Sequence, residues 1–142
     1  MTSSQENLKN LQKIGKLKAE PPDQVEFNGL VTSAGRKLQD AENVQLSPDS
    51  RFTLAYDAVH SFALAALRWH GYRAEHRYMV FQVLPHTLAF PANKWRFLDD
   101  CHQKRNLHLY DGGIVDDEQL IKELIAVAKE LQAAVKSLGP VG

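Results

Sequence analysis

The sequence is poor in cysteine, with Cys101 the single one in 142 residues. An intrachain disulfide is therefore excluded, and a reducing compartment is the natural expectation. Long apolar runs are also missing, because no stretch approaches the roughly 18 apolar residues of a membrane-spanning helix. The first six residues lack the basic segment and apolar run of a secretory signal. These absences predict a cytoplasmic protein that has no membrane partner.

Many signatures of catalysis and cofactor binding are absent as well. The chain has no G-x-x-x-x-G-K-[ST], G-x-G-x-x-G, H-E-x-x-H, C-x-x-C or G-x-S-x-G motif. Its six histidines include no pair four residues apart, and acidic residues are sparse among them. No metal site and no cofactor are therefore predicted from local spacing.

Charge is balanced over the whole chain but unevenly spread along it. Residues 1–19 carry four lysines and one glutamate, and residues 68–108 carry seven basic and three acidic residues together with five of the six histidines. A neutral protein is not a bulk polyanion binder, yet the second segment suits a local site for a phosphate or an RNA strand. The alternative is a set of solvated helix faces.

Apolar residues recur three and four positions apart along almost the whole chain, which predicts helices rather than strands. We expect helices over about 4–18, 23–43, 47–70, 75–90, 91–109 and 116–138. Pro85 should kink or split the fourth of these, and Asp116 should cap the last. The 47–70 helix is the most apolar and should lie at the centre.

The predicted fold is therefore all-α, an up-and-down bundle of about five helices with an additional N-terminal helix. Residues 1–22 would form the N-terminal helix and a Pro-Pro linker, and residues 23–142 the helical bundle.

The segment from Cys101 to Asp111 is the richest in groups that suit chemistry. On a helix, His102 and Arg105 share a face, as do Arg105 and His108, and Lys104 lies four residues before His108. An arginine can hold a phosphate while a nearby histidine or tyrosine moves a proton. The alternative is that Arg105 pairs with a neighbouring aspartate and His108 caps the helix. The aspartates in question are Asp99, Asp100 and Asp111.

Arg73 and Arg77 follow Gly71-Tyr72 and are further candidate phosphate ligands. The alternative is that Gly71 ends a helix and both arginines are solvated. The predicted binding residues are Arg73, Arg77, His102, Lys104, Arg105 and Asn106.

Three stretches together resemble the HEPN family (higher eukaryotes and prokaryotes nucleotide-binding): residues 29–41, residues 46–73, and Arg105-Asn106 through Tyr110-Asp111. The resemblance spans about residues 27–138. It implies a helical bundle that forms a homodimer. Many family members are metal-independent ribonucleases of toxin–antitoxin and defence systems, and others are inactive binding modules that work with a nucleotidyltransferase.

The active motif of that family is an arginine, usually followed by a polar residue, and then a histidine after four to six residues. Arg105-Asn106 matches the first part, but Tyr110 stands where the histidine would be. A tyrosine with a pKa near ~10 is a poor general base at neutral pH.

The expected function is accordingly a dimeric binding module for RNA, a nucleotide or a partner protein, such as an antitoxin or a nucleotidyltransferase. The alternative is an active ribonuclease in which Arg105 works with His108 or Tyr110. A purely structural subunit is a third possibility.

Overall fold

The computed structural model describes residues 2–142 as seven helices and one two-stranded sheet. The elements in chain order are α1 (Ser3–Lys13), β1 (Leu17–Ala19), α2 (Gln24–Ala41), α3 (Pro48–Trp69), β2 (Tyr72–Ala74), α4 (Arg77–Gln82), α5 (Leu84–Thr87), α6 (Ala92–Asp111) and α7 (Glu118–Lys136). The predicted all-α helical bundle is confirmed. The small sheet was not predicted.

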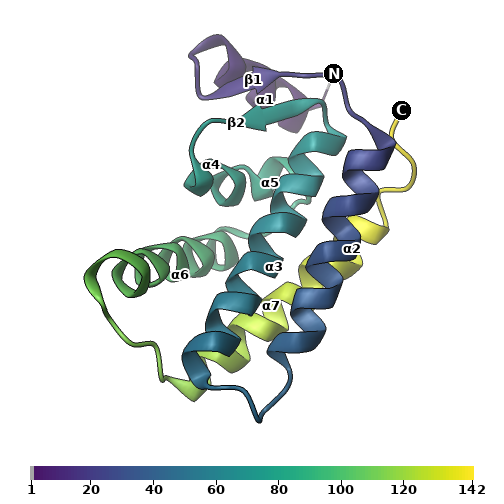
Figure 1. The fold of residues 1–142 in the computed structure, drawn as a ribbon. Coiled ribbons are helices and arrows are strands. Elements are labelled where there is room, and N and C mark those ends of the chain that lie inside the picture. Colours follow the sequence, from purple (N-terminus) through teal and green to yellow (C-terminus); the bar gives the residue numbers. More distant parts are fainter. Residues whose placement is uncertain (1) are drawn as a thin grey trace.

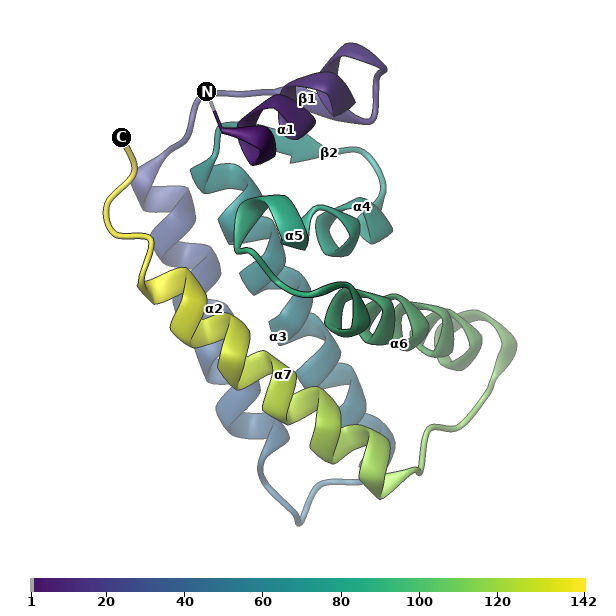
Figure 2. The ribbon, with the colours of Figure 1, turned by 180° about the vertical axis from the view of Figure 1, so that it is seen from behind.

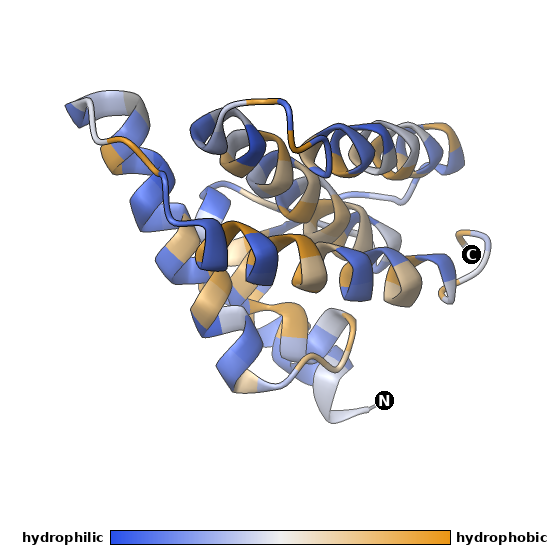
Figure 3. Ribbon diagram, turned by 90° about the horizontal axis from the view of Figure 1, so that it is seen from below, coloured by the Kyte–Doolittle hydropathy of each residue, from blue (hydrophilic) through white to orange (hydrophobic). Residues whose placement is uncertain are grey.

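Three long helices, α2, α3 and α7, lie side by side and form the main layer (Figures 1 and 2). Gly35 of α2 lets α7 approach closely, since a Cβ there would lie 3.3 Å from Nε2 of Gln132. The central helix is α3, as predicted, and eleven of its residues are buried. Hydrophobic residues gather where the helices adjoin, while hydrophilic residues dominate their outward faces (Figure 3).

The directions of these helices follow the expected up-and-down pattern only in part. Helices α2 and α3 are antiparallel, and Nε of Arg51 near the start of α3 donates to the carbonyl of Ala41 at the end of α2. Helices α3 and α7 run in the same direction. Their starts are joined by the Arg51–Glu118 ion pair, and their ends by Trp69, whose Nε1 donates to the carbonyl of Gly139. The parallel arrangement arises because α4, α5 and α6 carry the chain back before α7 begins.

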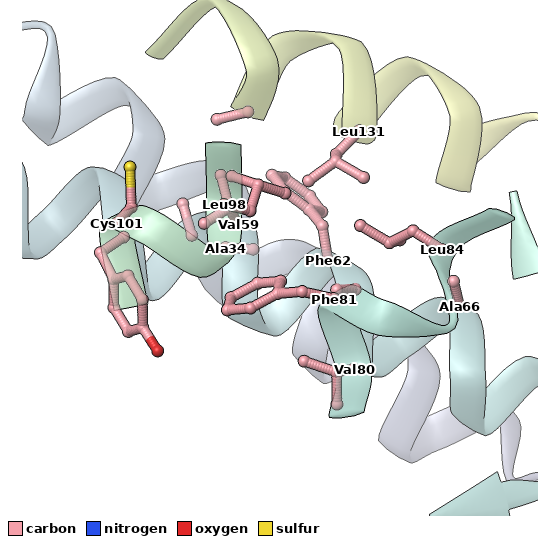
Figure 4. Close-up of a cluster of buried hydrophobic side chains, with 14 of the residues drawn as sticks. Ala34, Val59, Phe62, Ala66, Val80, Phe81, Leu84, Leu98, Cys101 and Leu131 are labelled. Atoms are coloured by element: carbon pink, nitrogen blue, oxygen red, sulfur yellow. The ribbon is translucent and has the colours of Figure 1, made fainter. Parts of the chain in front are cut away.

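The predicted break at Pro85 is confirmed, because α4 ends at Gln82 and α5 begins at Leu84. After α5, helix α6 crosses the main layer at an inclination (Figures 1 and 2). The side chains of Phe62, Phe81, Leu84 and Leu98 join α3, α4, α5 and α6 in one buried cluster (Figure 4). The predicted cap of α7 was wrong by one residue: the carboxylate of Asp117, and not that of Asp116, accepts the free backbone N–H groups.

The N-terminal segment differs from the expected helix over 4–18. Helix α1 ends at Lys13, Gly15 turns the chain with a φ of +82°, and β1 then pairs antiparallel with β2. Leu8 and Leu17 are buried against the rest of the molecule. The segment that looks like a separate helix and linker is therefore packed onto the bundle.

A buried arginine fastens this segment. Arg68 is only 2% exposed and donates to the carboxylate of Glu26. It also donates to the backbone carbonyls of Glu20, Pro21 and Tyr72 at 2.8–3.3 Å. Arg73 bonds to the carboxylates of both Glu20 and Glu26 at 2.7–2.8 Å. We call these four charged residues, Arg68, Arg73, Glu20 and Glu26, the Arg68 network.

No helix within residues 2–142 combines the length and apolarity needed to cross a membrane.

Candidate functional site

A cluster of polar and charged side chains lies where α3, α4 and α6 meet. At its centre is Tyr56 of α3, whose ring is buried and whose hydroxyl lies 2.8 Å from Nδ1 of His102 on α6. The guanidinium of Arg105 lies over the same ring, 5.5 Å from its centroid. Phe81 of α4 packs edge-on against Tyr56, with centroids 6.0 Å apart. We call the group Tyr56, His60, Arg77, His102, Arg105 and Asn106 the Tyr56 cluster.

Hydrogen bonds run through the cluster in one direction. Arg105, which can only donate, bonds to Oδ1 of Asn106 at 3.3 Å, so the amide nitrogen of Asn106 faces Nε2 of His102 at 3.3 Å. Nε2 therefore accepts, and the proton of the neutral ring lies on Nδ1, which donates to the Tyr56 hydroxyl. The hydroxyl proton of Tyr56 therefore takes no part in the hydrogen bond with His102.

The network favours the neutral form of His102, since an imidazolium would place an N–H against the N–H of Asn106. Burial lowers the pKa of His102; the carboxylate of Asp99 opposes this, and Arg105 and Arg77 reinforce it. Burial likewise lowers the pKa of His60 to about 4, and Arg77 is the strongest of the neighbouring cations that add to this shift. Both imidazoles are consequently neutral at pH 7.

Asn106→Asp is expected to raise the pKa of His102, because a carboxylate accepts from a protonated Nε2 where the amide donates to it. The shift should be visible in an NMR titration of the His102 ring proton. Asn93→Asp is the matched control, since it makes the same charge change at an exposed position of the same helix. If His102 had the same pKa in the two variants, the direction given above for the hydrogen bonds would be wrong.

Two arginines bring positive charge to the centre of the cluster. Burial raises the pKa of Tyr56, and the positive charges of Arg77 and Arg105 act against that shift. Within residues 2–142, neither arginine forms an ion pair with a carboxylate, so the alternative pairing of Arg105 with Asp99, Asp100 or Asp111 is not observed. In addition, Nε2 of His60 is buried and has no hydrogen-bond partner among the described residues.

Four of the six predicted binding residues thus come together: Arg77, His102, Arg105 and Asn106. Arg73 lies instead in the Arg68 network. Lys104 lines a separate hollow of about 190 Å³ beside the loop that follows α6, together with His108 and Asp117.

The predicted proton carriers lie apart from the Tyr56 cluster's hydrogen bonds. His108 uses Nδ1 to donate to the carbonyl of Gly113 at 2.7 Å, which ties the helix end to the following loop. Tyr110 is 73% exposed. Neither residue has a contact with Tyr56 or Arg105 among the interactions of the described residues.

Sequence reasoning missed Tyr56 because it fits the apolar pattern of α3, and it missed His60 because no other histidine lies at metal-ligand spacing from it. Their spacing of four residues on one helix face was the available signal. Cys101 is buried next to the cluster on α6, and burial raises the pKa of its thiol to about 12, so it is not a nucleophile. No three metal-ligating side chains gather anywhere in the described part of the chain.

Comparison of the chain with protein-family models, with curated proteins and with solved structures found no match.

Proposed function

We propose that this protein is a HEPN-type binding module that takes a phosphate-bearing ligand, RNA or a nucleotide, at the Tyr56 cluster. The observation that carries the proposal is the difference between two sets of arginines. Arg51, Arg68 and Arg73 are each neutralised by glutamates. Arg77 and Arg105 converge on one buried tyrosine with no carboxylate bound to either among residues 2–142. Unneutralised guanidinium groups beside other polar side chains suit a phosphate.

The remaining groups of the cluster fit the same ligand. The hydroxyl of Tyr56 and the orphaned Nε2 of His60 are buried, so they would reach the ligand through a bridging water molecule. The neutral state of both histidines leaves the two arginines as the positive charges of the site. These features support binding without requiring a metal ion.

The proposal includes a homodimer, as the resemblance to the family implies. Exposed apolar side chains near the end of α6 offer a contact surface, since Leu107, Tyr110 and Ile114 are 54–75% exposed. A toxin–antitoxin or stress-related pair, with an antitoxin or nucleotidyltransferase as partner, is the setting that this family suggests.

Arg105→Ala is expected to weaken binding of a trinucleotide of single-stranded RNA at least about tenfold, because it removes charge-assisted hydrogen bonds to phosphate. Affinity would be measured by calorimetry at low salt. Arg96→Ala is the control. Arg96 lies on the same helix, is exposed, and its guanidinium lies 5.7 Å from the centroid of the Trp95 ring. Its loss should therefore change affinity by no more than about twofold. Equal affinities of the two variants would overturn the proposal.

A metal-independent ribonuclease is the second candidate. It is favoured by the two neutral imidazoles of His60 and His102 beside Arg105, since a neutral imidazole can take a proton from a 2′-hydroxyl. This function predicts that the protein cleaves RNA in the presence of a chelator and leaves a cyclic phosphate. The cleavage should be lost in His102→Ala. Intact RNA bound by the wild-type protein would select the binding module.

A further inference from the structure

The segment that leads from α1 into β1 carries positive charge that the fold does not use. Lys9, Lys13, Lys16 and Lys18 are all exposed, and no acidic residue occurs between positions 7 and 19. None of the four forms an ion pair among the described residues, whereas Lys94 and Lys129 each bind a glutamate. Four unneutralised lysines on one short hairpin are available to an external polyanion.

The sheet places this hairpin next to the start of α4. Leu17 pairs with Ala74 in the antiparallel register, so Lys16 and Glu75 continue the two strands side by side, and Arg77 follows two residues later. The tip of the α1–β1 hairpin, the connection from β2 to α4 and the later part of α6 lie on the same side of the molecule in opposite views (Figures 1 and 2). The tip of the hairpin therefore lies on the same side as the segments that carry Arg77 and Arg105.

An aromatic pair lies on either side of Arg77 in the sequence. His76 and Tyr78 flank Arg77, and their rings stack with centroids 5.6 Å apart and an interplanar angle of 13°. His76 is exposed and Tyr78 is half-buried. Flat rings beside cationic side chains are the platforms on which proteins stack the bases of single strands.

We infer that the ligand is a single strand of RNA several nucleotides long, which runs from Arg105 and Arg77 over the His76–Tyr78 pair to the hairpin lysines. The inference rests on the proposed function for its first contact and extends it, because a free nucleotide would leave the lysines without a role. Glu75 is the acidic side chain on this path, and it has no cation bound to it among residues 2–142. A lipid surface fits less well, since Ile14 is the one large apolar side chain exposed on the described part of the hairpin.

The test compares a 12-nucleotide and a 3-nucleotide single-stranded RNA of mixed sequence by fluorescence anisotropy. The variant replaces Lys9, Lys13, Lys16 and Lys18 with glutamine, and the control replaces the exposed Lys122 and Lys136 of α7. The first variant should bind the longer RNA at least tenfold more weakly at low salt and leave the shorter RNA unaffected. A plot of log affinity against log salt concentration should become less steep by about 3, since each of the four lost phosphate contacts on a single strand contributes about 0.7.

His76→Ala provides a second variant at an exposed position, and it should weaken the longer RNA several-fold. Equal affinity of the wild-type protein for the two lengths would overturn the inference, as would an unchanged salt slope in the lysine variant. Binding to anionic vesicles that disappears in the lysine variant, with RNA binding intact, would also overturn it. A separate result would show that the proposed site at the Tyr56 cluster is wrong: Arg105→Ala would then bind the 3-nucleotide RNA with the affinity of the wild-type protein.

Discussion

Arg68→Ala is expected to destabilise the protein by about 3–5 kcal/mol, because it removes a buried guanidinium and leaves its backbone partners without their hydrogen bonds. The guanidinium of Arg68 is the hub of the Arg68 network, bonded to the carboxylate of Glu26 and to three backbone carbonyls. The variant would lose all of these bonds and leave a void in the interior. Urea denaturation followed by circular dichroism would measure the loss.

Arg73→Ala is the matched control, since it bonds to the same two glutamates from a position that is 37% exposed. Solvent screening reduces the value of such a pair to about 1 kcal/mol or less. If the two variants lose equal stability, burial is not what makes the Arg68 contacts strong.

Acid gives a second check on the Arg68 network. The hydrogen bond from Arg73 holds the pKa of Glu20 below its ordinary value of 4.5. Burial opposes the same shift at Glu26, but the hydrogen bonds from Arg68 and Arg73 outweigh it. A lowered pKa in the folded state means that this stabilisation is fully present above pH 4.5 and is lost as the pH falls through the folded values. Stability of the wild-type protein should therefore fall more steeply below that pH than stability of Arg68→Ala.

Phe81→Ala is expected to cost about 3–5 kcal/mol of stability, because it opens a cavity in a fully buried part of the core. The same ring supports the Tyr56 cluster, since its centroid lies 5.9 Å from that of His60 and 6.5 Å from that of His102. Affinity for the trinucleotide RNA should fall together with stability. Thermal unfolding and calorimetric binding, performed on one preparation below its unfolding transition, would measure both.

Phe81→Leu keeps most of the buried volume and is the matched control, with an expected cost of about 1 kcal/mol. Its effect on RNA affinity should be correspondingly small. A large loss of affinity in Phe81→Leu with little loss of stability would contradict a purely supporting role, because it would mean that the ring itself contacts the ligand.

Much of the fold could be predicted from local sequence, because helices leave a short-range signal. The apolar spacing of α3 and its bounds near residues 47–70 are properties of one continuous segment, and both were predicted. The break at Pro85 was predicted for the same reason. The pairing of β1 with β2 was not, since Leu17 and Ala74 are far apart in sequence and each strand has only three residues.

The site was predicted only where its residues lie on one helix. His102, Arg105 and Asn106 are three and four residues apart on α6, so their shared face could be read from spacing. Tyr56 belongs to another helix and resembles an ordinary core aromatic, and its contact with His102 depends on how α6 crosses α3. The opposite error occurred at Arg73, because its partners Glu20, just after β1, and Glu26, on α2, are far from it in sequence.

Pro21-Pro22 was predicted to be a linker, yet the carbonyl of Pro21 is one of the groups that bind Arg68. The first twenty residues cannot swing away from the bundle without stranding a buried positive charge. Heating should accordingly melt the N-terminal arm and the helices in a single cooperative transition. The lysines of that arm consequently keep a constant position relative to Arg105 for as long as the protein stays folded, and act as part of a rigid surface rather than as a tethered tail.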